Sequence, residues 1–309
     1  MINKVMKYIL MTLILGSSIH AKPKVIELEG FDTSKLTISD RFKDYMSDSS
    51  TRTYKLPFSS YQIIFDSNES DAEDFLRDLS SYANIEIRTN YQTEIYNLNP
   101  VIEKVFPSIS LTKTPVYHSY NCHNTSLLTQ GFLKRQSYST KEEIEFYLKN
   151  FCERVHELDA NVIGINESTM LSHSFTAISK NFIFDKPKNS ALSPYRFVPI
   201  HSSDDFRLYS CDSKKFHQLK CQKTKELENE IQAIDTYFSN YVVDLQNDHQ
   251  KVSKFKRLSK IESDLSRMMY TNKNCSLIKQ SILERINSLK SMYEAFPTSN
   301  IYGGGIGKH

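Results

Sequence analysis

The hydrophobic pattern of this chain changes character at Cys221. Before that point, short runs rich in β-branched and aromatic residues alternate with stretches that have helical spacing. After it, apolar residues are spaced alternately by four and three in a charged background, as an amphipathic helix requires. These residues are Leu227, Ile231, Ile234, Phe238, Tyr241 and Leu245. We therefore predict an α+β fold up to residue 210, followed by a helical region over residues 211–296.

The helical pattern falters at Asp248, resumes from Val252 to Met268, and is followed by another predicted helix from Ser276 to Phe296. A helical hairpin or a bundle is the simplest interpretation. The apolar stripe fits two uses, which are packing within the chain and binding of a helical protein partner through residues 222–296. The sequence does not choose between them. Residues 297–309, which are rich in glycine, are predicted to form a flexible tail.

The N-terminal region, residues 22–115, has the pattern of a small α+β unit. We predict a strand within residues 51–66, a short helix over 71–82 and a second strand over 84–91. Prolines at positions 100, 107 and 115 then predict an irregular approach to the middle of the chain. We assign no functional role to this region.

The first 21 residues have the pattern of a secretory signal. Lys4 and Lys7 precede an apolar run from Tyr8 to Leu15, and small residues end at Ala21. The apolar run is too short to cross a bilayer core of about 30 Å, and no cysteine follows it to accept a lipid. We therefore expect a periplasmic or secreted protein with no membrane span.

Charge and glycine content argue against several classes of function. Removing the two signal lysines from 39 basic and 36 acidic side chains leaves 37 and 36, so the mature charge is close to +1. This balance gives no reason to expect nucleic acid as a partner. Only Gly30, Gly131 and Gly164 lie between the signal and the tail, too few for a phosphate-binding loop. We expect no cofactor.

Five cysteines in an exported chain leave one unpaired if the others form disulfides. Cys211 and Cys221 are close enough in sequence to close a small loop, and Cys152 and Cys275 can form a longer bridge. Four cysteines allow three pairings, so these are candidates only. Cys122 lies in a different environment and is the odd thiol.

Cys122 lies at the predicted start of a helix. Asn121 is a good N-cap, and Leu127, Leu128, Phe132 and Leu133 have helical spacing after it. The free amides and the dipole at a helix N-terminus stabilise a thiolate, which is the nucleophilic form of cysteine. A second helix is predicted from Thr140, which forms a capping box with Glu143, with its apolar face continuing to Leu158 and Cys152 beside that face.

Three strand-like runs follow, at residues 161–166, 173–179 and 181–185. The last two are joined at Lys180 tightly enough to form a hairpin, which brings His173 at one end close to Asp185 at the other. An imidazole beside a thiol acts as its base and later protonates the leaving group, if a third polar group orients the ring. We therefore predict Cys122 as nucleophile, His173 as base and Asp185 as the orienting residue.

The backbone amides of Cys122 and His123 would supply part of an oxyanion hole, with Tyr120 or Tyr117 as a further candidate. His118, Cys122 and His123 do not make a metal site by spacing, because a structural zinc needs four ligands and no close partner pair follows. We expect no metal.

The run YNCHNTSLLTQGFL, then VIGIN, then HSFTAISKNFIFDKP resembles the NlpC/P60 cell-wall peptidases of the papain-like superfamily. The resemblance covers residues 117–190 and implies a papain-like core within residues 116–210, with a cysteine-bearing helix on a small antiparallel sheet. It implies the same roles for Cys122, His173 and Asp185. The implied activity is amide or isopeptide hydrolysis of peptidoglycan stem peptides.

The chain departs from that family at two places. Asn121, His123 and Asn124 stand where the family usually has aspartate before the cysteine and a serine-glycine pair after it. Aspartate at position 185 is more usual in the transglutaminase-like branch of the superfamily, which implies acyl transfer as the near alternative. A third possibility is a non-enzymatic exported protein that binds a partner through its C-terminal helices.

Overall fold

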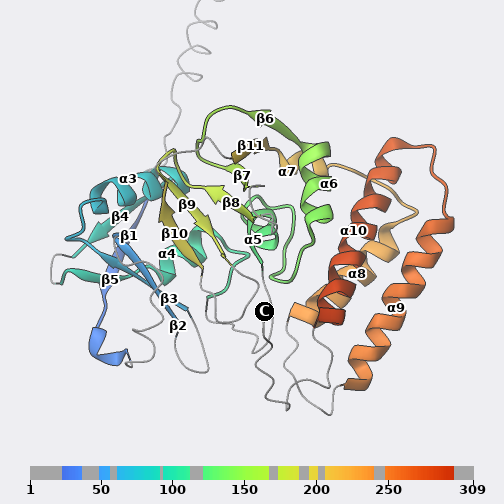
Figure 1. The fold of residues 1–309 in the computed structure, drawn as a ribbon, viewed down its shortest axis with the longest axis horizontal. Coiled ribbons are helices and arrows are strands. Elements are labelled where there is room, and N and C mark those ends of the chain that lie inside the picture. The colour runs from blue at the N-terminus through green and yellow to red at the C-terminus, as the bar shows by residue number, and fades with distance from the viewer. Residues whose placement is uncertain are drawn as a thin grey trace, which may run out of the picture.

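The computed structural model describes residues 23–36, 49–55, 61–90, 93–111, 121–166, 173–187, 195–200, 206–239 and 248–295. Within these residues the chain forms eight α-helices and two β-sheets, so the predicted mixed α+β class is confirmed. Figure 1 shows the two sheets and the C-terminal helices arranged side by side. The predicted signal (1–21) and the predicted tail (297–309) lie outside the described residues.

The N-terminal region forms a five-stranded sheet in the order β2-β3-β5-β1-β4, in which only β1 and β4 are parallel. The strand predicted within residues 51–66 is in fact two antiparallel strands. The strands are β1 (Lys24–Gly30), β2 (Thr51–Lys55), β3 (Tyr61–Asp66), β4 (Ile85–Thr89) and β5 (Ile95–Asn97). Of these strands, β4 was predicted from the sequence, whereas β1 and β5 were not.

Two α-helices accompany this sheet, together with a short 3-10 helix, η1 (Thr33–Lys35). The predicted helix is α3 (Ala72–Ala83), which ends at Asn84 in the left-handed conformation, φ 51°. The second helix, α4 (Asn99–Val105), lies where an irregular segment was expected. That expectation was wrong because Pro100 falls in the first turn, where proline costs no helical hydrogen bond.

The central sheet has six strands in the order β10-β9-β8-β7-β11-β6, and every neighbouring pair is antiparallel. The predicted hairpin is present, with Thr176 opposite Phe184 and Ala177 opposite Ile183. The strands are β6 (Cys152–Val155), β7 (Val162–Asn166), β8 (His173–Ala177), β9 (Phe182–Asp185), β10 (Arg196–Pro199) and β11 (Phe206–Cys211).

Three helices belong to this central part, namely α5 (Cys122–Thr129), α6 (Lys141–Phe151) and α7 (Ser213–His217). Helix α5 packs on β8, and α6 lies between α5 and the C-terminal helices (Figure 1). The prediction that the α6 pattern continues as helix to Leu158 was wrong. The helix ends at Phe151, because the next four residues pair with β11 as an edge strand.

The two disulfides join Cys152 to Cys211 and Cys221 to Cys275, so the candidate pairings Cys211–Cys221 and Cys152–Cys275 were wrong. The cause is the early end of α6, which places Cys152 on β6 directly opposite Cys211 on β11. Cys221 follows after helix α7 and is bonded instead to Cys275 on the last helix. Cys122 is the one cysteine with a free thiol.

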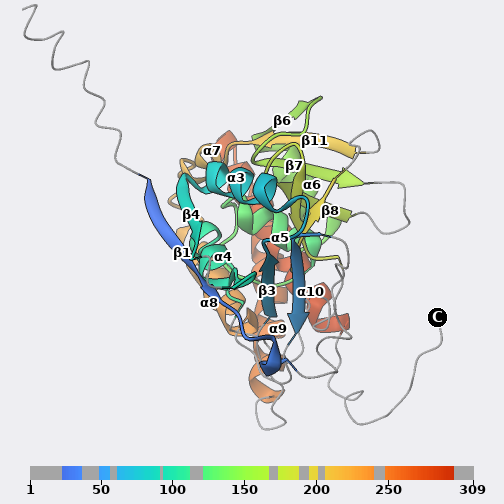
Figure 2. The same cartoon turned by 90° about the vertical axis from the view of Figure 1, so that its left-hand side faces the viewer.

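The C-terminal helices are α8 (Lys225–Ser239), α9 (Asp248–Arg267) and α10 (Lys273–Ala295). Their apolar stripes form a buried cluster of their own, with Ile234, Ile261 and Ile286 at or near zero exposure. The stripes therefore pack within the chain. The turned view in Figure 2 shows the helices behind both sheets, on the side away from β1 and β4. No described helix is long and apolar enough to cross a membrane.

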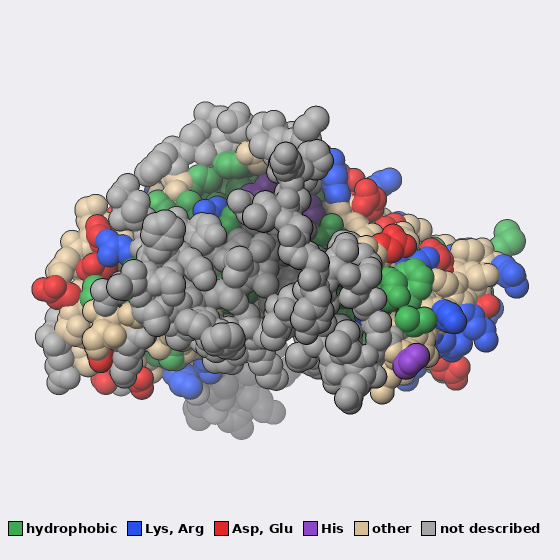
Figure 3. All heavy atoms as spheres, turned by 60° about the horizontal axis from the view of Figure 1, so that its bottom comes forward, with side chains coloured by type: hydrophobic (Ala, Val, Ile, Leu, Met, Phe, Trp, Pro, Cys, Tyr) green, Lys and Arg blue, Asp and Glu red, His purple; other side chains and the backbone are tan. Residues whose placement is uncertain are grey.

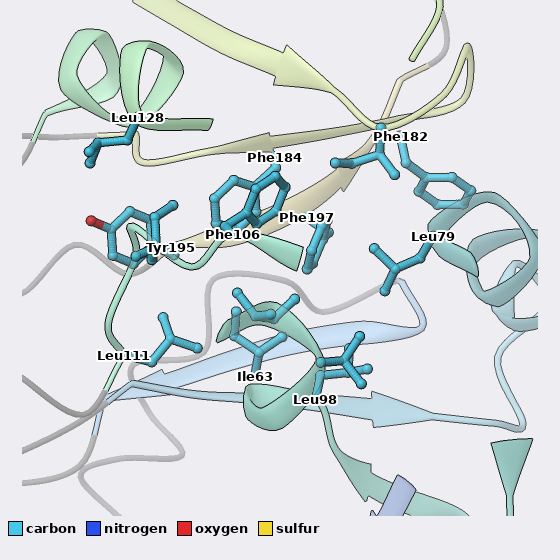
Figure 4. Close-up of a cluster of buried hydrophobic side chains, with 14 of the residues drawn as sticks. Ile63, Leu79, Leu98, Phe106, Leu111, Leu128, Phe182, Phe184, Tyr195 and Phe197 are labelled. Atoms are coloured by element: carbon cyan, nitrogen blue, oxygen red, sulfur yellow. The ribbon is translucent and has the colours of Figure 1, made fainter. Parts of the chain in front are cut away.

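One hydrophobic core connects the N-terminal and central parts. Figure 4 shows side chains from both sides of residue 115 meeting in it, among them Ile63 and Leu98 from one part and Phe184 and Phe197 from the other. Phe106 stacks on Phe184 with ring centroids 4.7 Å apart. The sheet that carries the candidate site is thus supported from behind by the N-terminal region.

Candidate functional site

Cys122 occupies the first position of α5. Asn121 before it is extended (φ −115°, ψ 177°), and its side-chain oxygen accepts a hydrogen bond of 3.0 Å from the Asn124 amide. This is the N-cap geometry expected from the sequence. The Cys122 side chain is almost buried, at 9% exposure, so the thiol lies where backbone amides point toward it and little water competes with them.

His173 and Asp185 meet across the hairpin, as their positions around Lys180 predicted. His173 begins β8, Asp185 ends β9, and His173 Nε2 lies 2.8 Å from Asp185 Oδ2. The carboxylate is 1% exposed, whereas the imidazole keeps 28% of its side-chain surface exposed. A buried carboxylate thus holds one nitrogen of a ring that still reaches the surface.

Arg196, which was not among the residues predicted from the sequence, binds the same carboxylate. It lies directly opposite Asp185 in the β9–β10 ladder. Its Nε lies 2.8 Å from Oδ1 and its Nη2 lies 3.2 Å from Oδ2 of Asp185. Such a forked pair fixes the carboxylate plane and offsets the cost of burying its charge. The only signal in the sequence is one arginine between Tyr195 and Phe197.

The ionisation of the site follows from these contacts. Burial raises the pKa of the Cys122 thiol, but the neighbouring imidazoles of His123 and His173 outweigh burial and lower it to about 5. Burial lowers the pKa of His173, but Asp185 and the Cys122 thiolate outweigh burial and raise it to about 10. Burial also opposes the charge on Asp185, yet His173 and Arg196 hold its pKa below the usual value. Near neutral pH the favoured state is a thiolate beside an imidazolium.

The ring nitrogen that serves the thiol can be assigned from the carboxylate contact. Because Nε2 of His173 is bonded to Asp185, Nδ1 is the nitrogen left for Cys122. His123 and Ser126 on α5 both contact Ser174 on β8, so the start of the helix lies beside the start of the strand, and His173 is near enough to Cys122 to lower its pKa. Asp185 thereby selects the tautomer and the rotation of the ring.

The backbone amide of His123 is a predicted oxyanion donor, and the side chain of the same residue makes buried contacts of its own. Its Nδ1 lies 2.9 Å from Ser174 Oγ and 3.8 Å from Cys122 Sγ. Ser126 donates to the same Ser174 hydroxyl over 3.1 Å. These buried polar contacts join α5 to β8 and place a second imidazole beside the sulfur. Such a buried hydrogen-bond network fixes the position of α5 relative to β8.

The backbone amide of Cys122 makes no hydrogen bond to the described residues, as expected at the first position of a helix. It therefore stays an oxyanion donor candidate. Tyr120, Tyr117 and His118 lie outside the described residues, so their expected roles stay predictions. Among the residues that the structure describes, no group of three or more His, Cys, Asp or Glu side chains is placed to hold a metal ion.

Asn121 and Asn124, which flank Cys122 and His123, make contacts of the same kind. Both contact the segment 135–139, which leads into α6. Asn121 donates to the Ser139 carbonyl over 2.6 Å and accepts from the Ser139 amide over 3.2 Å. Asn124 accepts from the Ser137 amide over 3.0 Å. The residues on either side of Cys122 are therefore anchored to a neighbouring segment.

Comparisons with family models, with curated proteins and with solved structures each found no match for this chain.

Proposed function

We propose that this chain is an exported papain-like cysteine hydrolase that cleaves an amide or isopeptide bond. The observation that carries the proposal is the arrangement of Cys122 at the start of α5 against His173, whose Nε2 is held 2.8 Å from Asp185. A thiolate, an imidazolium and an orienting carboxylate are the three groups that thiol acyl transfer requires. The arrangement also matches the roles that the sequence resemblance implies.

In the first half of the proposed reaction, the Cys122 thiolate attacks the carbonyl carbon of the substrate amide and forms a new C–S bond. The carbonyl oxygen takes the negative charge, and the Cys122 amide at the helix start is placed to stabilise it. The C–N bond then breaks as His173 Nδ1–H gives its proton to the leaving nitrogen. The products are a free amine, a thioester on Cys122 and a neutral His173.

In the second half, neutral His173 takes a proton from water through Nδ1 while the water oxygen attacks the thioester carbon. The C–S bond breaks, the substrate leaves as a carboxylic acid, and the thiolate–imidazolium pair is restored. Asp185 keeps its charge throughout, because the hydrogen bonds and positive charge of its partners, His173 and Arg196, outweigh the effect of burial and hold its pKa below the usual value. One water is consumed for each amide bond cleaved.

Export and a peptidoglycan stem-peptide substrate belong to the same proposal. Two disulfides and a secretory pattern at the N-terminus support an oxidising compartment, in which Cys122 is the one thiol left reduced. The substrate class rests on the resemblance of residues 117–190 to NlpC/P60 peptidases. It is tested by digesting purified peptidoglycan and identifying the new amine and carboxyl ends by mass spectrometry.

Acyl transfer to an amine is the second candidate, and the observation that favours it is the charged third residue, Asp185, held by Arg196. Transfer and hydrolysis share the thioester and differ in the group that attacks it. Adding a primary amine such as glycine methyl ester to the digestion separates them. Hydrolysis yields free acid with or without the amine, whereas transfer yields an amide whose mass includes the added amine.

The first test of the site is alkylation of the unreduced protein with iodoacetamide, followed by mass spectrometry. We expect one label per chain, on Cys122, with a rate that stays high between about pH 5 and pH 9 because the thiolate persists far below the ordinary pKa near 8.5. Cys122→Ala removes the label. His173→Ala shifts the onset of labelling upward, because the imidazolium no longer stabilises the anion.

The proposal fails if Cys122 labels with the pH dependence of a simple thiol and His173→Ala changes nothing. In that case the thiol is a buried structural group. Circular dichroism of each variant shows whether the fold is intact, so that loss of labelling is not confused with unfolding.

A further inference from the structure

Arg285 on α10 is a charged residue buried at the boundary between the C-terminal helices and the central part, at 5% exposure. Its Nη1 lies 2.9 Å from Glu143 on α6, and its Nη2 lies 3.1 Å from Asp235 on α8. A guanidinium this deep in the protein needs fixed acceptors, and both Nη atoms of Arg285 have them, whereas its Nε has no partner among the described residues. The two carboxylates fix the position of Arg285.

The same guanidinium also binds the segment 135–139. Arg285 Nη1 donates to the Tyr138 carbonyl over 3.0 Å and lies 3.4 Å from Ser139 Oγ. Arg285 Nη2 donates to Ser137 Oγ. These contacts join residues about 147 positions apart in the chain, and nothing local in the sequence predicts them. Arg285 therefore ties α10 to the segment that Asn121 and Asn124 hold from the other side.

The capping box predicted for α6 shows how this link is built. Thr140 Oγ1 accepts from the Glu143 amide over 3.2 Å, as predicted. The Glu143 carboxylate does not return to the Thr140 amide, because it binds Arg285 and lies 2.6 Å from Ser288 Oγ. Ser288 Oγ accepts from the Thr140 amide instead, over 2.9 Å. Arg285 and Ser288, both on α10, thus bind the polar groups at the start of α6.

We propose that Arg285 is a positioning residue for Cys122, so that the C-terminal helices are part of the catalytic unit and not a separate partner-binding module. The path runs from Arg285 to Ser137 and Ser139, and from these to the asparagines that flank Cys122. Every side chain on this path is buried. The inference deepens the proposed function, since it concerns how the same thiol is held.

Loss of the Arg285 contacts frees the segment 135–139 on one side and weakens the hold on Asn121, which caps α5. The thiol then samples positions farther from His173, and its pKa rises toward that of a simple cysteine. The effect reaches Cys122 without any direct contact between Arg285 and the site. It therefore shows in the ionisation of the thiol and not only in stability.

The test compares full-length wild type with Arg285→Lys, which keeps the charge beside Glu143 but cannot make the forked contacts. Amide exchange is measured at Asn124, Ser137 and Ser139, whose N–H groups bond to Asn121 or Asn124. We expect exchange there to rise about tenfold or more. We also expect the pH midpoint of Cys122 alkylation to rise by about one unit.

Lys290→Met is the matched control, because it removes a partly exposed contact of the same helix, the 2.7 Å ion pair with Glu262, which does not reach the segment 135–139. It should leave both readouts at wild-type values. Wild-type exchange and a wild-type alkylation midpoint in a folded Arg285→Lys protein would overturn the proposal. So would an equal change in both variants.

If Arg285→Lys does not fold, the double variant Glu143→Gln/Arg285→Met is measured the same way, because it removes both charges of the closest pair.

The failure of the proposed hydrolase function and the failure of the positioning role give different results. If wild-type Cys122 alkylates as a simple thiol, the proposed hydrolase function fails, while the exchange rates still decide whether Arg285 holds the segment. If wild-type Cys122 is activated and the variant changes neither readout, only the positioning role fails.

Discussion

His173 Nε2 lies 2.8 Å from Oδ2 of Asp185, and these two residues stand at the open end of one β-hairpin. Because Thr176 pairs with Phe184, Asp185 lies two residues before the position that would be directly opposite His173. The contact between the two side chains is therefore diagonal across the ladder. Diagonal neighbours on one face are within reach of long side chains. The register of the hairpin therefore decides whether the imidazole is held at all.

Replacing Asp185 by asparagine keeps the shape of the side chain and removes its charge. We expect turnover of an amide substrate to fall roughly 10²-fold or more, because the ring loses its orienting anion and binds its proton less tightly. Alkylation of Cys122 below neutral pH should slow as well. Steady-state rates and the labelling assay measure the two effects.

Asp78→Asn is the matched control for this change. Asp78 also contacts the hairpin, at its closed end, where it accepts a 3.3 Å hydrogen bond from Asn181. Turnover should be unchanged in the Asp78→Asn variant. Equal losses in the two variants would mean that the hairpin is merely destabilised and that the charge of Asp185 has no special role.

The dependence of turnover on pH follows from the two shifted groups. The pKa of Cys122 is lowered to about 5, so the thiolate is present above that pH and is lost as the pH falls through it. The pKa of His173 is raised to about 10, so the imidazolium is present below that pH and is lost as the pH rises through it. We expect kcat/KM to follow a broad bell with limbs near these values. A basic limb close to the ordinary histidine pKa near 6.5 would show that the ion pair does not form.

Local signals account for the parts of the site that the sequence predicted. An N-cap beside Cys122 and a tight reversal at Lys180 are encoded within a few residues, so the start of α5 and the β8–β9 hairpin were both located.

Long-range pairing accounts for what the sequence analysis missed. Arg196 acts through the β9–β10 ladder and Arg285 through contacts with residues far earlier in the chain, and neither has a local pattern. The end of α6 was misplaced for the same reason. The spacing of Phe151, Val155 and Leu158 is helical, but pairing with β11 and the bond to Cys211 turn residues 152–155 into a strand.

The disulfide pairing predicts both a peptide map and a loss of stability. Digestion without reduction should release the linked pairs Cys152–Cys211 and Cys221–Cys275, and one free thiol per denatured chain should remain at Cys122. Changing Cys152 and Cys211 together to serine should lower the free energy of unfolding by about 4 kcal/mol, since the bridge closes a loop of about 60 residues. A Cys211–Cys221 peptide, or no change on denaturant unfolding, would contradict this pairing.

Gly164 on β7 lies opposite Phe175 on β8, and the phenyl ring covers it. A Cβ at position 164 would lie 2.0 Å from the Cζ atom of that ring, so the ring must move before any side chain fits. We expect Gly164→Ala to destabilise the fold by about 1–3 kcal/mol in denaturant unfolding. Phe175→Leu should recover part of the loss in the double variant, because the two changes share one contact. Phe175 is two residues from His173, so Cys122 alkylation should also slow in Gly164→Ala. If the losses of unfolding free energy in Gly164→Ala and Phe175→Leu simply add up in the double variant, the ring does not rest on this glycine.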